Sequence, residues 1–193
     1  TAHLMAQAVK RLYPKTKVTI GPFLENRFYY DFDVVTPFTE EDLLKIEEEM
    51  LKISKENIDI IHEEKSRAEA LKFFKNIGED YKIEIINDLD DSEVLKVYAQ
   101  GDFTDLCRGP HVQSTGMIQH FKLLSSSAAY WRGDENNQTL QRVYGTSFTS
   151  AKDLKKYLLM LEEQKKRDHR KIGKELDLYF HDEEVGPGLP LWT

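Results

Sequence analysis

The spacing of apolar residues along this chain switches repeatedly between the helical and the strand period, which restricts the folds open to it. Leu4, Ala8 and Leu12 share one helical face, and residues 43–53 repeat that pattern. Runs typical of strands lie between and after them, several joined by short connections. No steady strand–helix–strand rhythm appears. The order therefore predicts an α+β fold, with an antiparallel sheet and packed helices.

The ends of the expected elements carry recognisable signals. Pro14 ends the first helix, and Thr39 before a run of acids caps the second. Ser66 with Glu69 forms a capping box for a third helix that reaches Phe74. The expected strands are residues 17–20, 28–33, 58–62, 81–86, 94–99 and 121–124, followed by a hairpin of 130–132 with 140–144.

The chain of 193 residues suits one sizeable domain with appendages. After Phe148 the pattern becomes helical again, and it predicts one long helix from about Ser150 to Gly173. We therefore expect a domain over residues 1–148, a linker helix over 149–173 and a separate segment over 174–193.

Composition limits the cellular setting and the partners. No apolar run approaches the roughly 18 residues of a membrane span, and a single cysteine cannot form an internal disulfide. We expect a cytoplasmic protein without a membrane partner. The net charge of −7 argues against a nucleic-acid coat protein. The basic run from Lys165 to Lys174 is either a solvated helix face or a contact for nucleic-acid phosphates.

The segment from Cys107 to His111 carries the clearest chemical signal. It places the only cysteine four residues before a histidine, around the bend of Gly109 and Pro110. A thiolate and an imidazole on one cleft could ligate a transition metal or manage protons at a carbonyl. The alternative is a buried cysteine beside a histidine that hydrogen-bonds a loop.

Other polar residues are candidates only in combination. Asp105 would point to the same side as Cys107 if that segment is extended. His3, near a helix start, would by default be a surface histidine, and Lys82, in an expected strand, would by default face water. Of the neighbouring tyrosines that include Tyr30, one is expected in the core and the other at the surface.

Taken together, these segments resemble bacterial threonyl-tRNA synthetases. The resemblance runs nearly end to end and rests on His3-Leu4-Met5-Ala6-Gln7-Ala8, Ile20-Gly21-Pro22, Phe28-Tyr29-Tyr30-Asp31, Cys107-Arg108-Gly109-Pro110-His111, Tyr130-Trp131-Arg132-Gly133-Asp134, Leu140-Gln141-Arg142-Val143-Tyr144-Gly145 and Arg167-Asp168-His169-Arg170-Lys171. It implies that residues 1–148 are the editing domain, a second-additional-domain fold. Residues 149–173 would be the linker helix, and 174–193 the opening of the class II catalytic domain.

The resemblance also implies an activity. Such a ligase joins threonine to tRNA(Thr) with ATP, and its synthetic site admits serine, which lacks one methyl group. A missing methyl gives only about 1–3 kcal/mol of discrimination. A second site would therefore hydrolyse seryl-tRNA(Thr), by water attack on the aminoacyl ester.

The roles of individual residues follow from the family's motifs. His3 matches the second histidine of a His-x-x-x-His motif, whose first histidine would stand four residues earlier, outside this sequence. Cys107 and His111 match a Cys-x-x-x-His motif. The implied catalytic residues are His3, Lys82 and His111, and the implied substrate-binding residues are Tyr30 beside the adenosine, with Asp105 and Cys107 at the serine amine and hydroxyl.

The implied cofactors and partners complete the expectation. Three histidines and one cysteine would form a closed zinc set without a free position for catalysis, so no obligatory metal is expected for editing. Zinc, if bound, would use His3, Cys107 and His111. ATP and zinc are expected in the catalytic domain that the sequence does not include. The expected partners are the acceptor end of tRNA(Thr), the rest of the synthetase chain and a second subunit in a homodimer.

Two other functions are open. One is a module that binds and orients tRNA without hydrolysis, which predicts salt-dependent affinity alone. The other is a zinc-dependent hydrolase of a different ester, which predicts stoichiometric metal and loss of activity with a chelator.

Overall fold

The chain divides into two compact units, Thr1–Thr149 and Ser150–Thr193. A computed structural model describes residues 1–181, 185–186 and 189–192. Within these residues no helix is both long and apolar enough to cross a membrane.

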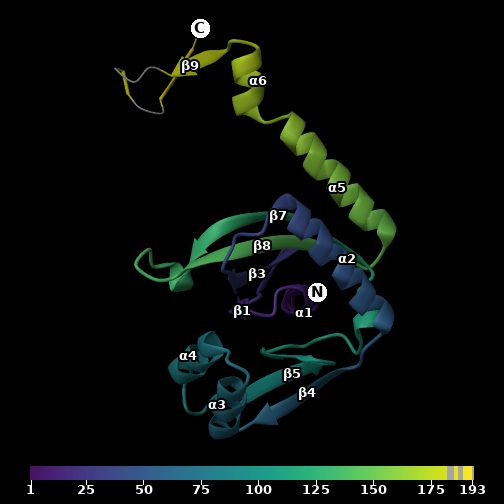
Figure 1. Cartoon of the computed structure of the whole chain (residues 1–193). Helices are drawn as coiled ribbons and strands as arrows, with labels where there is room; N and C mark the ends of the chain where they lie inside the picture. Colours follow the sequence, from purple (N-terminus) through teal and green to yellow (C-terminus); the bar gives the residue numbers. More distant parts are fainter. Residues whose placement is uncertain (182–184, 187–188, 193) are drawn as a thin grey trace. The chain divides into compact units, whose positions relative to one another are not determined.

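The first unit contains two antiparallel sheets (Figure 1). The larger has five strands in the order β1-β3-β8-β7, with β2 paired to β3, and the smaller has the order β4-β5-β6. The strands are β1 (Lys17–Val18), β2 (Phe23–Leu24), β3 (Arg27–Asp33), β7 (His120–Tyr130) and β8 (Thr139–Phe148) in the larger sheet, and β4 (Ile60–Lys65), β5 (Leu95–Gln100) and β6 (Phe103–Leu106) in the smaller. The predicted α+β class with antiparallel sheets is confirmed.

Helix α1 (Ala2–Leu12) lies between the two sheets, as Figure 1 shows. Every residue from His3 to Val9 is buried, because both sheets cover this helix. Its apolar side chains join those of β3 and α2 in the main core. The amide of Gln7 ties the helix to the smaller sheet, where it donates to the Gln100 carbonyl at 3.1 Å and accepts from the Gln100 side chain at 2.8 Å. Residues at the start of α1 are thereby held against both sheets.

Helix α2 (Glu40–Glu56) begins at the predicted cap. The Asp42 amide donates to the Thr39 hydroxyl at 3.2 Å, and the Asp42 carboxylate accepts from the Thr39 amide at 3.0 Å. Ile46, Met50 and Ile53 are buried on one stripe, as their spacing predicts. The Ser66 capping box also forms, at the start of α3 (Arg67–Asn76).

Residues 81–86 are the clear error of the sequence prediction, because they belong to helix α4 (Asp80–Asp88) and not to a strand. Their isoleucines favour strands, but packing on two sides overrides that preference. Tyr81 and Ile85, four residues apart, pack with Trp131 and Leu140. Ile86, on another face, packs in the cluster beneath β5. A helix buries both sets, and it also directs Lys82 inward.

The β7–β8 hairpin forms, but it is longer than predicted. It pairs Tyr130 with Thr139, and the strand expected at 121–124 continues to Tyr130 as one element. Residues Trp131–Gly133 form a 3₁₀ turn instead of a strand, and Arg132 there has a φ of 58°. Arg132 pairs with Asp88, which joins the hairpin tip to α4.

The second unit consists of α5 (Ala151–Lys166), α6 (His169–Glu175) and a hairpin of β9 (Tyr179–His181) with β10 (Pro190–Trp192). The helical prediction for residues 150–173 is therefore confirmed in kind, with a break at Arg167 and Asp168. The Asp168 carboxylate accepts from the Arg170 amide at 2.9 Å and so starts a new helix.

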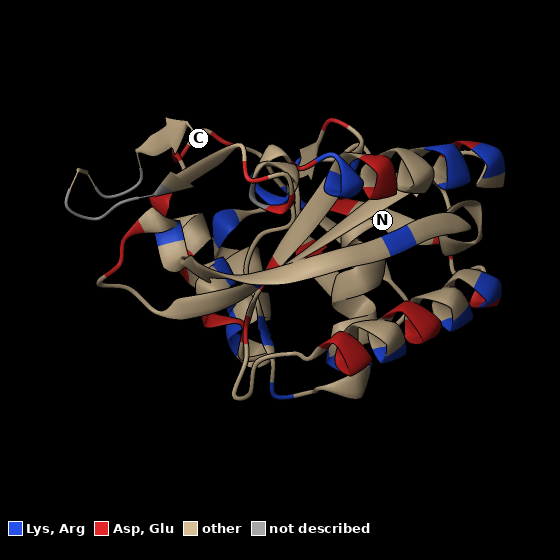
Figure 2. Cartoon of the chain, turned by 90° about the horizontal axis from the view of Figure 1, so that it is seen from above, with Lys and Arg blue, Asp and Glu red and all other residues tan. Residues whose placement is uncertain are grey.

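The charges of the helices are mixed, as the blue and red segments of Figure 2 show. In the basic run, Lys166 pairs with Glu163 at 3.0 Å and Arg170 with Asp168 at 2.7 Å. Local pairing of this kind favours a solvated helix face over a dedicated phosphate contact.

Candidate active site

The amino group of Lys82 lies in the interior of the first unit, although lysine usually faces water. Glu79 fixes the start of α4, since its carboxylate accepts from the Val18 amide at 3.1 Å and from Lys10 at 2.7 Å. Lys82 is 1% exposed, donates to the Thr19 carbonyl and forms an ion pair with Asp105. A buried ammonium requires such compensation. Lys82 is therefore a fixed charge within the fold.

Asp105, on β6, is the centre of the polar cluster. Its carboxylate contacts Lys82, accepts from the Tyr30 hydroxyl at 2.6 Å and lies 3.2 Å from Nε2 of His3. Burial by itself would raise the pKa of Asp105, but the Lys82 ammonium and His3 bring it below its ordinary value. Asp105 is thus an anion in an interior position.

His3 reaches this cluster from α1, one turn before Gln7. Burial lowers the pKa of His3 to about 3, so the ring is neutral at physiological pH. Because Nε2 lies against the Asp105 carboxylate, Nε2 carries the proton, and Nδ1 keeps a free lone pair. That Nδ1 atom is buried and has no hydrogen-bond partner among the described residues. Nδ1 of His3 is therefore a basic nitrogen to which no described residue donates a hydrogen bond.

Cys107 and His111 complete the cluster from the segment after β6. Nε2 of His111 lies 3.3 Å from the Cys107 sulfur, and the His111 ring meets that of His3 edge to face at 4.4 Å. Burial lowers the pKa of His111 to about 4. The predicted bend at Gly109 and Pro110 is present, with a cis peptide bond. Both imidazoles of the cluster are thus neutral and close together.

The Tyr98 ring stacks on the His111 ring, a contact that the sequence does not reveal. The rings stack with centroids 3.9 Å apart and planes at 21°. Tyr98 lies opposite Asp105 in the β5–β6 pairing, which brings it beneath the bend. Gly109 has a φ of 67°, and a Cβ atom there would overlap the Tyr98 hydroxyl. Tyr98 therefore positions His111.

The stack gives a testable prediction for any reaction at this site. Tyr98→Phe keeps the ring and should change the rate less than threefold, whereas Tyr98→Leu should lower it about 10-fold, since a stacked pair contributes ~0.5–1.5 kcal/mol. Single-turnover kinetics at this site check this result, with circular dichroism as the control for folding. Equal losses in both variants would show that the hydroxyl, not the ring, matters.

The donor set of His3, Cys107 and His111 could hold a metal ion. One ligand atom from each residue lies within 4.8 Å of the others. A zinc ion would need such atoms about 3.5 Å apart, so a modest contraction would be required. The free Nδ1 of His3 fits this use, and three protein ligands would leave one position open.

The first unit has two cavities of about 350 Å³ each, and they share Ile85 and Leu89 in their linings. The first is lined by residues of α4, β5 and β6 and reaches Cys107. The second is bordered by Asp31 and Arg142, whose side chains form a bidentate pair at 2.7 and 2.8 Å. The Arg142 guanidinium lies 4.0 Å from the ring centre of Tyr29.

The structure brings together the residues that the sequence singled out. His3, Lys82, Asp105, Cys107 and His111 meet in one cluster from separate elements. Tyr30 joins them through its hydroxyl, 3.1 Å from the Lys82 amino group, but the side chain is 0% exposed. The residues missed are Thr19, which acts through its carbonyl, and Tyr98, and neither carries a motif.

Part of the chain matches a known class of domain. Residues 95–144 match the family model described as the threonyl and alanyl tRNA synthetase second additional domain. These residues include β5, β6, the Cys107–His111 segment and part of the β7–β8 hairpin.

A comparison over the whole of this chain identifies a narrower group of proteins. The chain is 60% identical over 192 residues to the threonine–tRNA ligase of Anoxybacillus flavithermus, covering 100% of this chain and 30% of that protein. It is 57% identical over 192 residues to that of Geobacillus kaustophilus (100% and 29%) and 58% to that of Clostridioides difficile (100% and 30%). The chain thus corresponds to a fragment of threonine–tRNA ligases, and it spans about 30% of the length of these relatives.

Proposed function

We propose that the first unit is the editing domain of a threonine–tRNA ligase and hydrolyses the ester of mischarged seryl-tRNA(Thr). The observation that carries this proposal is the cluster of neutral imidazoles, an ammonium and a thiol, with a cavity that reaches its cysteine. This set can bind a water, accept its proton and stabilise negative charge on a carbonyl oxygen. The ligation of threonine with ATP would belong to the remaining part of such a protein.

His3 and His111 are the proton carriers in this mechanism. A water held by the free Nδ1 of His3 would lose its proton to an imidazole as it attacks the ester carbonyl. The tetrahedral intermediate would then break its bond to the ribose oxygen, and the imidazolium would return the proton to that oxygen. The products are serine and a free tRNA end.

Lys82 would stabilise the charge of the intermediate, and Asp105 and Cys107 would bind the serine amine and hydroxyl. An ammonium fixed in a low-dielectric interior stabilises an oxyanion more than one in water does. Tyr30, being wholly buried, would act by orienting Asp105 and Lys82. The terminal nucleoside would then occupy the second cavity, near Tyr29 and Arg142.

Deacylation of seryl-tRNA(Thr) and threonyl-tRNA(Thr), measured side by side, tests the proposal. The protein should include the upstream segment that carries the first histidine of the family's motif. We expect rapid loss of serine while threonine is retained, because the pocket would exclude the extra methyl group. If neither ester is cleaved faster than in buffer, the domain is instead a module that binds and orients tRNA.

The metal requirement gives a separate prediction. We propose that hydrolysis needs no metal, so dialysis against EDTA should leave the seryl-tRNA rate unchanged. Added zinc should inhibit, because it would occupy the Nδ1 and thiol groups that the water and substrate need. Loss of activity with EDTA and its return with zinc would favour the zinc-dependent hydrolase.

The proposed partners follow from this activity. They are the acceptor end of tRNA(Thr), the remaining synthetase chain and a second subunit in a homodimer, in the cytoplasm. Salt dependence of tRNA affinity would measure the phosphate contacts.

A further inference from the structure

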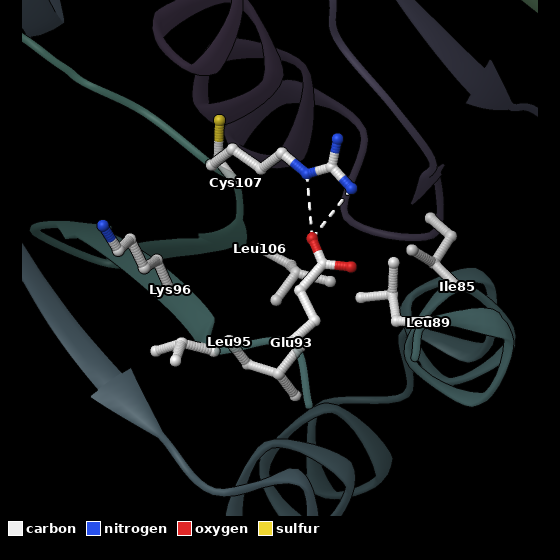
Figure 3. A pocket seen from close by; sticks show the side chains of 9 residues that line it. Ile85, Leu89, Glu93, Leu95, Lys96, Leu106 and Cys107 are labelled. Carbon is white, nitrogen blue, oxygen red and sulfur yellow. Dashed lines mark hydrogen bonds and ion pairs between the residues drawn. The ribbon is translucent and has the colours of Figure 1, made fainter. Parts of the chain in front are cut away.

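The first cavity, hereafter the Leu106 pocket, has no task in the mechanism above. It is formed by Ile85 of α4, Leu89 just after that helix, Val94 and Leu95 near the start of β5, and Leu106 of β6. Figure 3 shows that Ile85, Leu89 and Leu106 lie around the carboxylate end of Glu93. An open apolar surface of this kind is suited to bind a flat apolar ligand.

A single ion pair lies at this pocket. The guanidinium of Arg108 donates to one oxygen of Glu93, from Nε at 2.9 Å and from Nη2 at 2.8 Å. The Arg108 side chain is 84% exposed, so the pair contributes little to stability. Its opening would leave an arginine free at the rim of an apolar pocket.

The Leu106 pocket adjoins the proposed substrate site. It includes Cys107 at one end, and it shares Ile85 and Leu89 with the second cavity. Ile85 lies one helical turn after Lys82 on α4. Consider an RNA strand whose terminal ester lies at Lys82 and whose terminal nucleoside lies in the second cavity. Its preceding nucleotide would then lie next to the Leu106 pocket.

We propose that the Leu106 pocket binds the base of the unpaired nucleotide that precedes the terminal nucleoside of the tRNA. This inference rests on the proposed editing function and extends it to a second nucleotide. The base would lie on Leu89 and Leu106, and Arg108 would leave Glu93 to stack on the base or pair with its phosphate. Unpaired bases are commonly held on apolar and guanidinium surfaces, whatever their sequence.

Binding of two ligands distinguishes this site from the catalytic cluster. The probes are a fluorescent trinucleotide with the sequence of a tRNA 3′ end and adenosine alone, each titrated into the full-length synthetase that carries these residues. Arg108→Ala and Val94→Glu should weaken trinucleotide binding about 10-fold, within the ~1–3 kcal/mol of one stacked base. Adenosine binding should not change. Val94 is 59% exposed, so its substitution leaves the core intact.

Glu93→Gln separates a binding role from a structural one. If Arg108 serves the ligand, loss of the Glu93 charge frees it, and trinucleotide binding should tighten. If the ion pair only stabilises the fold, Glu93→Gln and Arg108→Ala should weaken binding alike. Lys52→Ala, on the exposed surface of α2, is the control for loss of one positive charge.

The outcomes for hydrolysis are distinct from these. In Arg108→Ala and Val94→Glu, KM for seryl-tRNA should rise about 10-fold, while kcat and the hydrolysis of seryl-adenosine stay constant. A synthetase that hydrolyses neither seryl-tRNA nor seryl-adenosine contradicts the editing function. The trinucleotide titration still shows whether the Leu106 pocket binds a base. Unchanged trinucleotide binding in both Arg108→Ala and Val94→Glu would overturn the inference.

Discussion

Replacement of Asp105 with asparagine is expected to lower the free energy of unfolding by about 3–5 kcal/mol, because it leaves the Lys82 ammonium buried without a counter-charge. The same change should slow seryl-tRNA hydrolysis by about 100-fold or more, since Lys82 and His3 both lose the group that orients them. Urea unfolding and single-turnover deacylation measure the two effects.

A second variant separates charge from shape. Lys82→Met together with Asp105→Asn removes both charges, and it should restore stability to within about 1 kcal/mol of the original. Hydrolysis should stay absent, because the cation for the oxyanion is gone. Glu47→Gln is the control, since its 2.7 Å pair with Lys122 is partly exposed and includes no residue of the cluster. A loss below ~1 kcal/mol in Asp105→Asn would mean that water reaches Lys82.

The sequence predicts the chemistry of the site better than its geometry. Cys107 and His111 are close in sequence, so one bend suffices to bring them together. The Gly109–Pro110 pair predicts that bend. The cap at Thr39 and the capping box at Ser66 are equally local, and both form as predicted. Local signals of this kind depend on few other residues.

The remaining features depend on contacts distant in sequence. The helix that carries Lys82 exists because Tyr81 and Ile86 pack on different elements, and no pattern within 81–86 states this. Tyr98 meets His111 only through the β5–β6 register. The break before α6 is the exception, since Asp168 is a recognisable cap within a charged run. The family resemblance, not periodicity, joined His3 to the cluster.

Stability should fall as the pH is lowered, because of His3. Burial holds its pKa at about 3 in the folded state, while the unfolded chain has the ordinary value of about 6.5. Between these values the unfolded state binds a proton that the folded state does not, so stability is full above pH 6.5 and declines as the pH falls. The expected loss from His3 is about 2 kcal/mol at pH 5. Urea unfolding at a series of pH values measures it.

His3→Gln tests both roles of this residue, because its effects on stability and activity should have opposite signs. Glutamine does not titrate, so the loss of stability between pH 7 and pH 5 should shrink by the ~2 kcal/mol assigned to His3. Hydrolysis should fall by about 10²–10⁴-fold, since the free Nδ1 base is gone. His169→Gln, at an exposed histidine of α6 in the second unit, should leave hydrolysis unchanged. An unchanged pH slope in His3→Gln would mean that His3 has the same pKa in the folded and unfolded states, which contradicts the buried, neutral ring.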